Sequence, residues 1–150
     1  MDIIFTGFDQ IFHLQNLLLM AGGLVIGIVI GAIPGLNVPL AVALALPFTY
    51  HMPPLAGLSM LIGIYKGGTH GGSISAILIN VPGAPAAAAT AIDGYALARQ
   101  GKAGKALKLS IYASVFGEIL SDIALILAAA QLAKIATTFG PAEFFALGLF

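Results

Sequence analysis

A glycine-rich polar segment interrupts the apolar part of the sequence, and its residue types are those that bind anions. From Lys66 to Ser75 the order is Lys-Gly-Gly-Thr-His-Gly-Gly-Ser-Ile-Ser. Glycines permit positive φ and close backbone approach, so a loop of this kind can present several N–H groups to an anion. We expect the segment to break a helix and to begin a new one at Ser73 and Ser75, with Gly71, Gly72, Ser73 and Ser75 all binding the substrate anion. It is no P-loop, because Ser73 stands where that motif needs lysine.

A second break combines proline, glycine and asparagine in the order Ile-Pro-Gly-Leu-Asn-Val-Pro, over residues 33–39. Asn37 suits the N-cap position of a following helix. A helix that begins there, at membrane depth, would offer free N–H groups and its positive dipole end to an anionic substrate. Pro34 and Gly35 would form the turn of this site. A simple surface turn between two membrane spans is the alternative.

A third break, Asn-Val-Pro-Gly, begins at Asn80 and repeats this arrangement of a helix, a Pro-Gly turn and a short helix. The side chain of Asn80 could offer its carbonyl to a cation or its amide to an anion, beside Pro82 and Gly83. A hydrogen bond between helices is the alternative role for this asparagine.

Three ionisable side chains fall inside apolar runs, where a charge is costly unless it is paired or faces water. Lys66 could add positive charge to an anion site, or extend to the membrane interface. Glu118 and Asp122 stand four residues apart on an expected helix. They are candidates for binding a coupling Na+ or H+, or for pairing with Lys66. An intramembrane catalytic pair is the least favoured interpretation, because no nucleophile accompanies them. The histidines are far apart and cysteine is absent, so we expect no metal site, catalytic residue or other cofactor.

The composition places these residues in a membrane protein. Of the 150 residues, 59% are hydrophobic and 8% are charged, and the mean hydropathy is +1.04. A soluble domain carries about 25% charged residues. No charged residue occurs in 10–65 or in 67–92, and each stretch exceeds the ~20 residues that cross a bilayer. The formal net charge of +0 gives no reason to expect nucleic-acid binding.

We therefore expect an all-α integral membrane protein, a multi-span helical bundle with broken or re-entrant half-helices. The expected apolar elements are residues 17–33, 38–46, 55–65, 73–81 and 109–135, with a further span beginning at 143. Pro47 is expected to close the second of these. A four-residue spacing predicts one close-packing helix face made of Gly23, Gly27, Gly31 and Gly35. The segment 93–108 holds four basic residues and one acid, which favours the cytoplasmic side.

The order of these segments resembles the large membrane subunit of the tripartite tricarboxylate transporters, the TctA family. Four segments carry the resemblance: Gly31–Leu36 (GAIPGL), Gly71–Gly83 (GGSISAILINVPG), Asp93–Gly101 (DGYALARQG) and Phe139–Ala146 (FGPAEFFA). The sequence departs from that pattern near Lys66 and His70 and at Ala84, and the acids of the last helix lie outside it. Members of the family are much longer, so residues 1–150 are expected to be the N-terminal part of a transmembrane permease domain.

The resemblance implies a multi-pass permease of the bacterial inner (plasma) membrane and no enzyme. Such a permease imports tricarboxylates or related carboxylates, coupled to a cation or proton gradient. Its partners are a small membrane subunit and a periplasmic solute-binding protein. In a transporter with inverted repeats this chain would supply one side of the substrate site. A non-transporting fragment or structural membrane subunit is the alternative.

Overall fold

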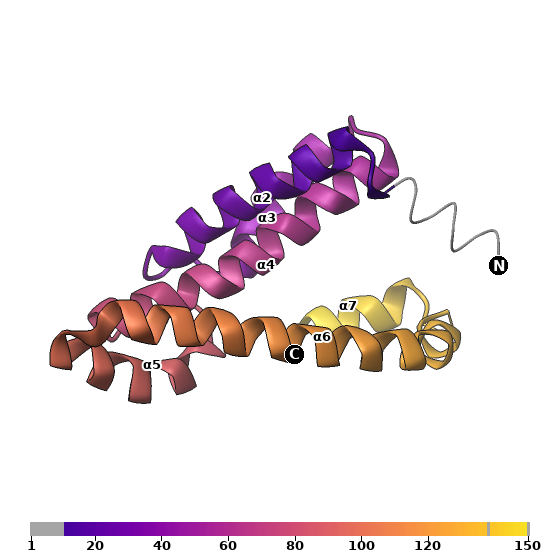
Figure 1. The fold of residues 1–150 in the computed structure, drawn as a ribbon. Coiled ribbons are helices and arrows are strands. Elements are labelled where there is room, and N and C mark those ends of the chain that lie inside the picture. The colour runs from indigo at the N-terminus through magenta and orange to yellow at the C-terminus, as the bar shows by residue number, and fades with distance from the viewer. Residues whose placement is uncertain (1–10, 138, 150) are drawn as a thin grey trace. The chain divides into compact units, whose positions relative to one another are not determined.

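The computed structural model describes residues 11–137 and 139–149, and every regular element in these residues is a helix (Figure 1). The expected all-α class is therefore confirmed. The chain forms two compact units, one ending at Ile111 and the other beginning at Tyr112. Two helical stretches are long and apolar enough to cross a membrane, Leu14–Ala32 and Ala87–Ala129.

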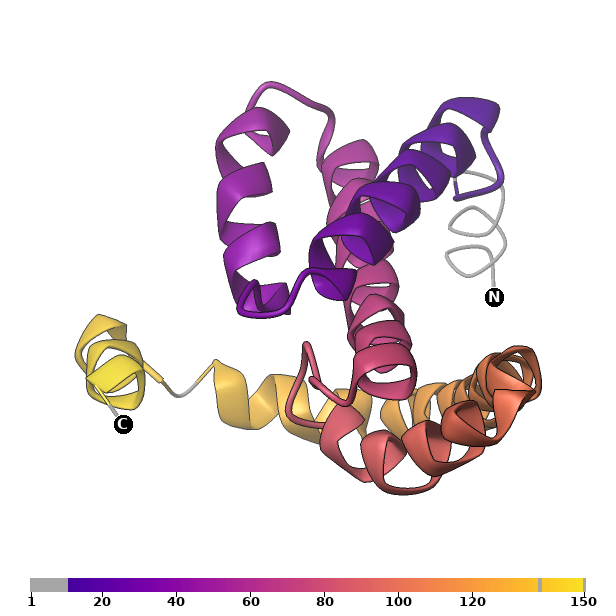
Figure 2. The same ribbon diagram turned by 90° about the vertical axis from the view of Figure 1, so that its left-hand side faces the viewer.

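Three helices form the centre of the first unit: α2 (Leu14–Ala32), α3 (Val38–Thr49) and α4 (Pro54–Ile79). α3 runs beside α4 in the opposite direction, which Figure 2 shows clearly. The start of α3 lies at Gly68 and its end lies at Gly57, because a Cβ on either glycine would meet Val38 or Thr49.

Glycines bring α2 and α4 into backbone contact along their length. A Cβ on any of six glycines would lie closer than 3.0 Å to a carbonyl oxygen of the other helix. The glycines of α2 are Gly23, Gly27 and Gly31, which meet the carbonyls of Met60, Ile64 and Gly68. Those of α4 are Gly63, Gly67 and Gly71, which meet the carbonyls of Met20, Leu24 and Ile28. Residue numbers rise together on both sides, so the two helices are parallel.

The predicted glycine face is confirmed at its first three positions and wrong at the fourth. Gly35 lies beyond the end of α2, with φ +93 and open space around it. This conformation is one that side-chain-bearing residues rarely adopt, so glycine serves the turn there and not the packing.

The predicted helix break at residues 66–72 is wrong, because α4 continues through it without interruption. Positive φ among the described glycines occurs only at Gly35 and Gly101, so no anion-binding loop forms in this segment. Ser73 and Ser75 lie inside the helix and do not begin one. Glycine costs about 1 kcal/mol in a helix relative to alanine. Close packing against α2 offsets that cost, since no larger residue would fit.

The prediction that Pro47 ends the second helix is also wrong. α3 continues for two residues to Thr49. A proline near the C-terminus of a helix removes only its own N–H donor. The hydroxyl of Thr49 donates to the carbonyl of Leu46 at 2.8 Å, which satisfies one of the last carbonyl groups.

After α4 the chain forms α5 (Ala87–Leu97), the π-helical turn η1 (Ala98–Lys102) and the long helix α6 (Ala103–Ala136). Gly101 in η1 has φ 76 and produces a kink between the two helices. Ala76 of α4 is buried together with two alanines of α5, Ala87 and Ala91.

The second unit contains the part of α6 from Tyr112 onward and α7 (Pro141–Leu149). The side chain of Glu143 accepts a hydrogen bond from the N–H of Gly140 at 2.8 Å. Glu143 thereby stabilises the start of α7, where a negative charge also suits the helix dipole.

Candidate functional site

The turn after α2 lies against the middle of α4. Gly31, in the last turn of α2, meets the backbone of Gly68, and Val38 at the start of α3 packs on the same glycine. A Cβ on Gly68 would lie 3.0 Å from Cγ2 of Val38. The turn at residues 33–37 therefore lies beside Gly68 of α4.

The segment after α4, residues 80–86, folds back along that helix to the same level. The N–H of Gly83 donates to the carbonyl of Gly72 at 3.3 Å. A Cβ on Gly83 would lie 2.9 Å from the Cα of Gly72 and would collide with the carbonyl of Gly31. Three glycines from three segments thus meet without intervening side chains. The structure brings the first and third predicted breaks together, and we call this contact of Gly31, Gly72 and Gly83 the glycine junction.

The glycine junction lies within the length of α4, away from both ends. At ~1.5 Å per residue it is about 27 Å from Pro54 and about 11 Å from Ile79. α3 has 12 residues and α5 has 11, so each is too short to cross the ~30 Å apolar core of a bilayer. The expectation of half-helices is met in these two elements.

Both half-helices begin near the glycine junction and lead away from it in opposite directions. α3 leads toward the Pro54 end of α4, while α5 passes Ala76 and then Ile77, toward the other end. The start of α3 lies beside Gly68 and the start of α5 beside Ala76, about 12 Å apart along α4, so the two helix N-termini lie on either side of the glycine junction. Helix N-termini carry partial positive charge, and discontinuous helices of transporters direct such ends at anionic substrate groups.

Asn37 caps the first of these half-helices, as its position in the sequence predicts. Its φ is −104, and its Oδ1 accepts a hydrogen bond from the N–H of Leu40 at 2.9 Å. The side-chain oxygen is thus engaged with the helix end. The exposed amide group of the same side chain can still donate.

Asn80 has a backbone role that the sequence analysis missed. It ends α4 in the left-handed conformation, with φ 59 and ψ 28, and its N–H donates to the carbonyl of Ala76 at 3.1 Å. Asparagine tolerates this conformation better than most residues, and helices commonly end in this way. An asparagine two residues before a proline was the signal in the sequence.

Ser75 is hydrogen-bonded to the glycine junction. It is buried, and its hydroxyl donates at 3.1 Å to the carbonyl of Gly72, the group that also accepts the N–H of Gly83. Gly71 packs against the backbone of α2 at Ile28. In this arrangement Gly71, Gly72 and Ser75 position the two breaks, whereas Pro34, Gly35, Asn37, Asn80 and Pro82 are exposed residues of those breaks.

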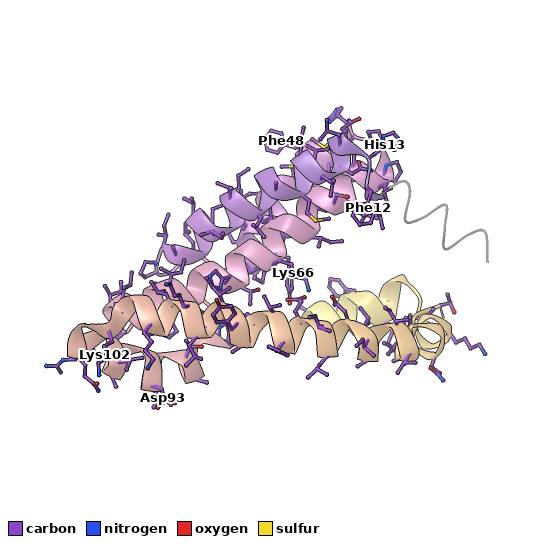
Figure 3. All side chains as sticks on the ribbon, in the orientation of Figure 1. Phe12, His13, Phe48, Lys66, Asp93 and Lys102 are labelled. Atoms are coloured by element: carbon purple, nitrogen blue, oxygen red, sulfur yellow. The ribbon has the colours of Figure 1, made fainter. Side chains whose placement is uncertain are left out.

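Lys66 and Ser73 lie on another face of α4. Residues three and four apart share a helix face, so these two residues lie together with Thr69 and His70, and His70 also borders the face of Gly63 and Gly67 that contacts α2. All four are half-buried. Figure 3 labels Lys66 on the side of α4.

Glu118 and Asp122 belong to the second unit and lie one turn apart on α6. Glu118 is half-buried and Asp122 is exposed within that helix. Their predicted roles in ion coupling or in pairing with Lys66 stay predictions. In residues 11–137 and 139–149 no group of three or more metal-ligating side chains occurs.

Comparison with known proteins identifies the family of this chain. The sequence matches the family described as the tripartite tricarboxylate transporter TctA family over residues 17–150. It is 41% identical over 150 residues to an uncharacterized 52.8 kDa protein in the TAR-I ttuC' 3' region of Agrobacterium vitis. That alignment covers 98% of this chain and 30% of the relative, so the chain spans less than a third of the relative's length. No solved structure matches. Because the family match covers most of the residues, the chain belongs to the TctA family of tripartite tricarboxylate transporters.

Proposed function

We propose that this chain is the N-terminal part of a multi-pass permease subunit in the bacterial inner membrane that imports tricarboxylates or related carboxylates. The family makes it a component of a transporter. The proposed partners are a small membrane subunit and a periplasmic solute-binding protein that delivers the carboxylate. A gradient of Na+ or H+ drives uptake, with Glu118 and Asp122 as candidate coupling residues.

The meeting of two helix breaks at the glycine junction is the observation that supports a substrate site in this part of the chain. The N-termini of α3 and α5, one on each side of the glycine junction along α4, favour an anionic ligand, and the exposed turn residues can supply backbone and amide donors. The remainder of the permease would supply the opposite side in an inverted repeat. The basic segment Arg99–Lys108 would lie on the cytoplasmic side.

The direct experiment is uptake of radiolabelled di- and tricarboxylates by cells that carry the complete permease and both partners. We expect uptake of at least one carboxylate, dependence on the binding protein, and loss of uptake when an ionophore dissipates the coupling gradient. A monocarboxylate of similar size serves as the control solute. If no carboxylate accumulates although the assembled complex is in the membrane, the transport function is wrong. Uptake unaffected by ionophores would refute the coupling alone.

A non-transporting structural subunit is the second candidate. A complex that keeps full uptake after deletion of residues 11–137 would favour that role.

A further inference from the structure

We propose that the turn around η1 binds the anionic headgroups of phospholipids at the membrane surface. Four cations carry this contact, and we call them the basic turn: Arg99, Lys102, Lys105 and Lys108. The inference goes beyond the proposed function, because it concerns the lipid that surrounds the permease and holds whichever solute the permease carries.

The basic turn lies at one end of the first unit. α5 packs against the last turns of α4, where Ala87 is buried together with Ala76 and a Cβ on Gly94 would meet the side chain of Ile77. α4 ends two residues after Ile77, whereas α5 continues into η1. The basic turn therefore lies near the C-terminal end of α4, and Figure 3 labels Lys102 there.

Within the described residues, no group pairs with these four cations. All of them are exposed, and none of their side chains makes a hydrogen bond or an ion pair with another residue in that part of the chain. Asp93 is the only acid in residues 67–117. Four positive charges therefore accompany one negative charge over residues 93–108, and an anionic partner is the complement of such a surface.

The lysines of the basic turn share one side of a helix. Gly101 is the only residue of η1 with a non-helical backbone, so the helix is continuous from Lys102 into α6. Lys102, Lys105 and Lys108 follow at a spacing of three residues, which keeps them on one side over about 9 Å. The flexible stem of each lysine lets its ammonium group extend sideways to a headgroup.

The residues after the basic turn place it at the boundary of an apolar span. Leu109 follows directly, lies on the same side of the helix as Lys105 and is 62% exposed. Residues 109–117 carry no charge, and the helical stretch Ala87–Ala129 is apolar enough to cross a membrane. A bilayer has about 5–8 Å of headgroup region on each side of its ~30 Å apolar core. When Leu109 enters the hydrocarbon, the lysines lie at the depth of the headgroups, so phospholipid is the anionic partner within reach.

Fluorescence quenching by brominated phospholipids measures this preference at one position, because residues 1–150 contain no tryptophan. Leu109→Trp would be made in the complete permease, with any tryptophan outside this part replaced, and reconstituted with brominated phosphatidylglycerol or brominated phosphatidylcholine. Leu58→Trp, exposed near the start of α4, is the control reporter. A single lysine near an anionic surface gains a factor of about five in binding, so we expect at least a fivefold preference for phosphatidylglycerol at position 109. At position 58 the preference should stay below about twofold, because no basic residue adjoins it in the sequence.

Charge variants identify the groups responsible for the preference at position 109. Lys102→Gln, Lys105→Gln and Lys108→Gln together should reduce it below about twofold, whereas Lys105→Arg alone should keep it. Lys134→Gln removes an exposed cation near the other end of α6 and should leave the preference unchanged. Raising the salt concentration to about 1 M should abolish the preference, because the Debye length falls to about 3 Å.

Thermal stability gives a second measurement that needs no tryptophan. Dioctanoyl phosphatidylglycerol should raise the Tm of the unmodified permease in detergent more than dioctanoyl phosphatidylcholine does, because a ligand of the folded state stabilises it. The difference between the two lipids should disappear in the variant that lacks all three lysines. The same Tm shows whether this variant folds.

Equal quenching by the two lipids at position 109, or a preference that survives replacement of the three lysines, overturns the inference. If the lipids are equivalent and the small membrane subunit shields Lys105→Cys from a soluble maleimide, the basic turn contacts a protein surface and lipid binding is wrong. Carboxylate uptake is measured separately, so either result leaves the transport function as it stands.

Discussion

Replacement of Gly27 by alanine probes the contact on which the first unit depends. Gly27 is the central glycine of α2, and its backbone lies against Ile64 and Gly68 of α4. An added Cβ would lie 2.8 Å from the N atom of Gly68 and would collide with the carbonyl of Ile64. Both neighbours are backbone atoms of a helix and cannot rotate away as a side chain can.

The magnitude follows from that geometry. Ordinary van der Waals contact begins at 3.4 Å, and the carbonyl of Ile64 is even closer to the added Cβ than the N atom of Gly68 is, so the helices must move apart at this point. A gap of ~0.5–1 Å forfeits about a quarter to a half of the attraction between facing atoms. Overpacking of this kind costs about 1–3 kcal/mol, and each lost Cα–H···O contact costs about 0.5–1 kcal/mol. The helix propensity of alanine returns about 1 kcal/mol. We expect the free energy of unfolding to fall by about 1–3 kcal/mol in total.

Gly22→Ala is the matched control, because Gly22 lies in the same helix and nothing lies within 4 Å of an added Cβ. The free energy of unfolding of Gly22→Ala should rise by up to about 1 kcal/mol, because alanine has a higher helix propensity than glycine. The assay is the apparent Tm of the purified complete permease in detergent, followed by size-exclusion chromatography after heating. The Tm of Gly27→Ala should fall and that of Gly22→Ala should stay or rise. Equal Tm values for the two variants would refute the parallel contact of α2 and α4.

Three further substitutions address the helix ends. Asn37→Ala removes the hydrogen bond to Leu40 and should lower stability by about 1 kcal/mol, while Asn37→Asp keeps the cap; equal thermal stability of the two would contradict the capping role. Asn80 has φ 59, so Asn80→Gly should keep the fold and Asn80→Ala should lower the free energy of unfolding by about 1–2 kcal/mol. If Asn80→Gly also leaves uptake unchanged, the Asn80 amide is not in the substrate site. Gly101→Ala should cost about 1–2 kcal/mol because Gly101 has φ 76, whereas Gly104→Ala, inside α6 and in open space, should not destabilise; a Tm loss shared by both would indicate a cause other than backbone strain.

The sequence alone predicts much of the helical architecture, because apolar periodicity, proline and charge act locally. The helix ends near residue 33 and near Asn80, the cap at Asn37 and the shortness of α3 follow from residue types within a few positions of each other. The membrane class follows from composition, since too few charged residues are present to cover a surface in water.

The role of the glycines depends on tertiary contact. The local preference of glycine favours a loop over a helix, and this holds for all four glycines of the segment, Gly67, Gly68, Gly71 and Gly72. The sequence around them does not reveal that a second helix packs against them. The choice depends on a second helix that carries glycines at the matching spacing, Gly23, Gly27 and Gly31, and on the parallel direction that α3 imposes. Only the folded chain contains that information. The segment that resembles an anion-binding loop in the sequence is therefore a continuous helix, and the other two breaks pack against it.

The separation of the polar and glycine faces of α4 has the same origin. In the sequence, Lys66, Ser73, Gly71 and Gly72 are neighbours and resemble a single site. A continuous helix distributes them around its axis, so that the glycines contact α2 and the segment after α4 while the polar side chains lie elsewhere. The residue types came from the sequence, but which of them act together was decided by the helix that formed and by the backbone that packed against it.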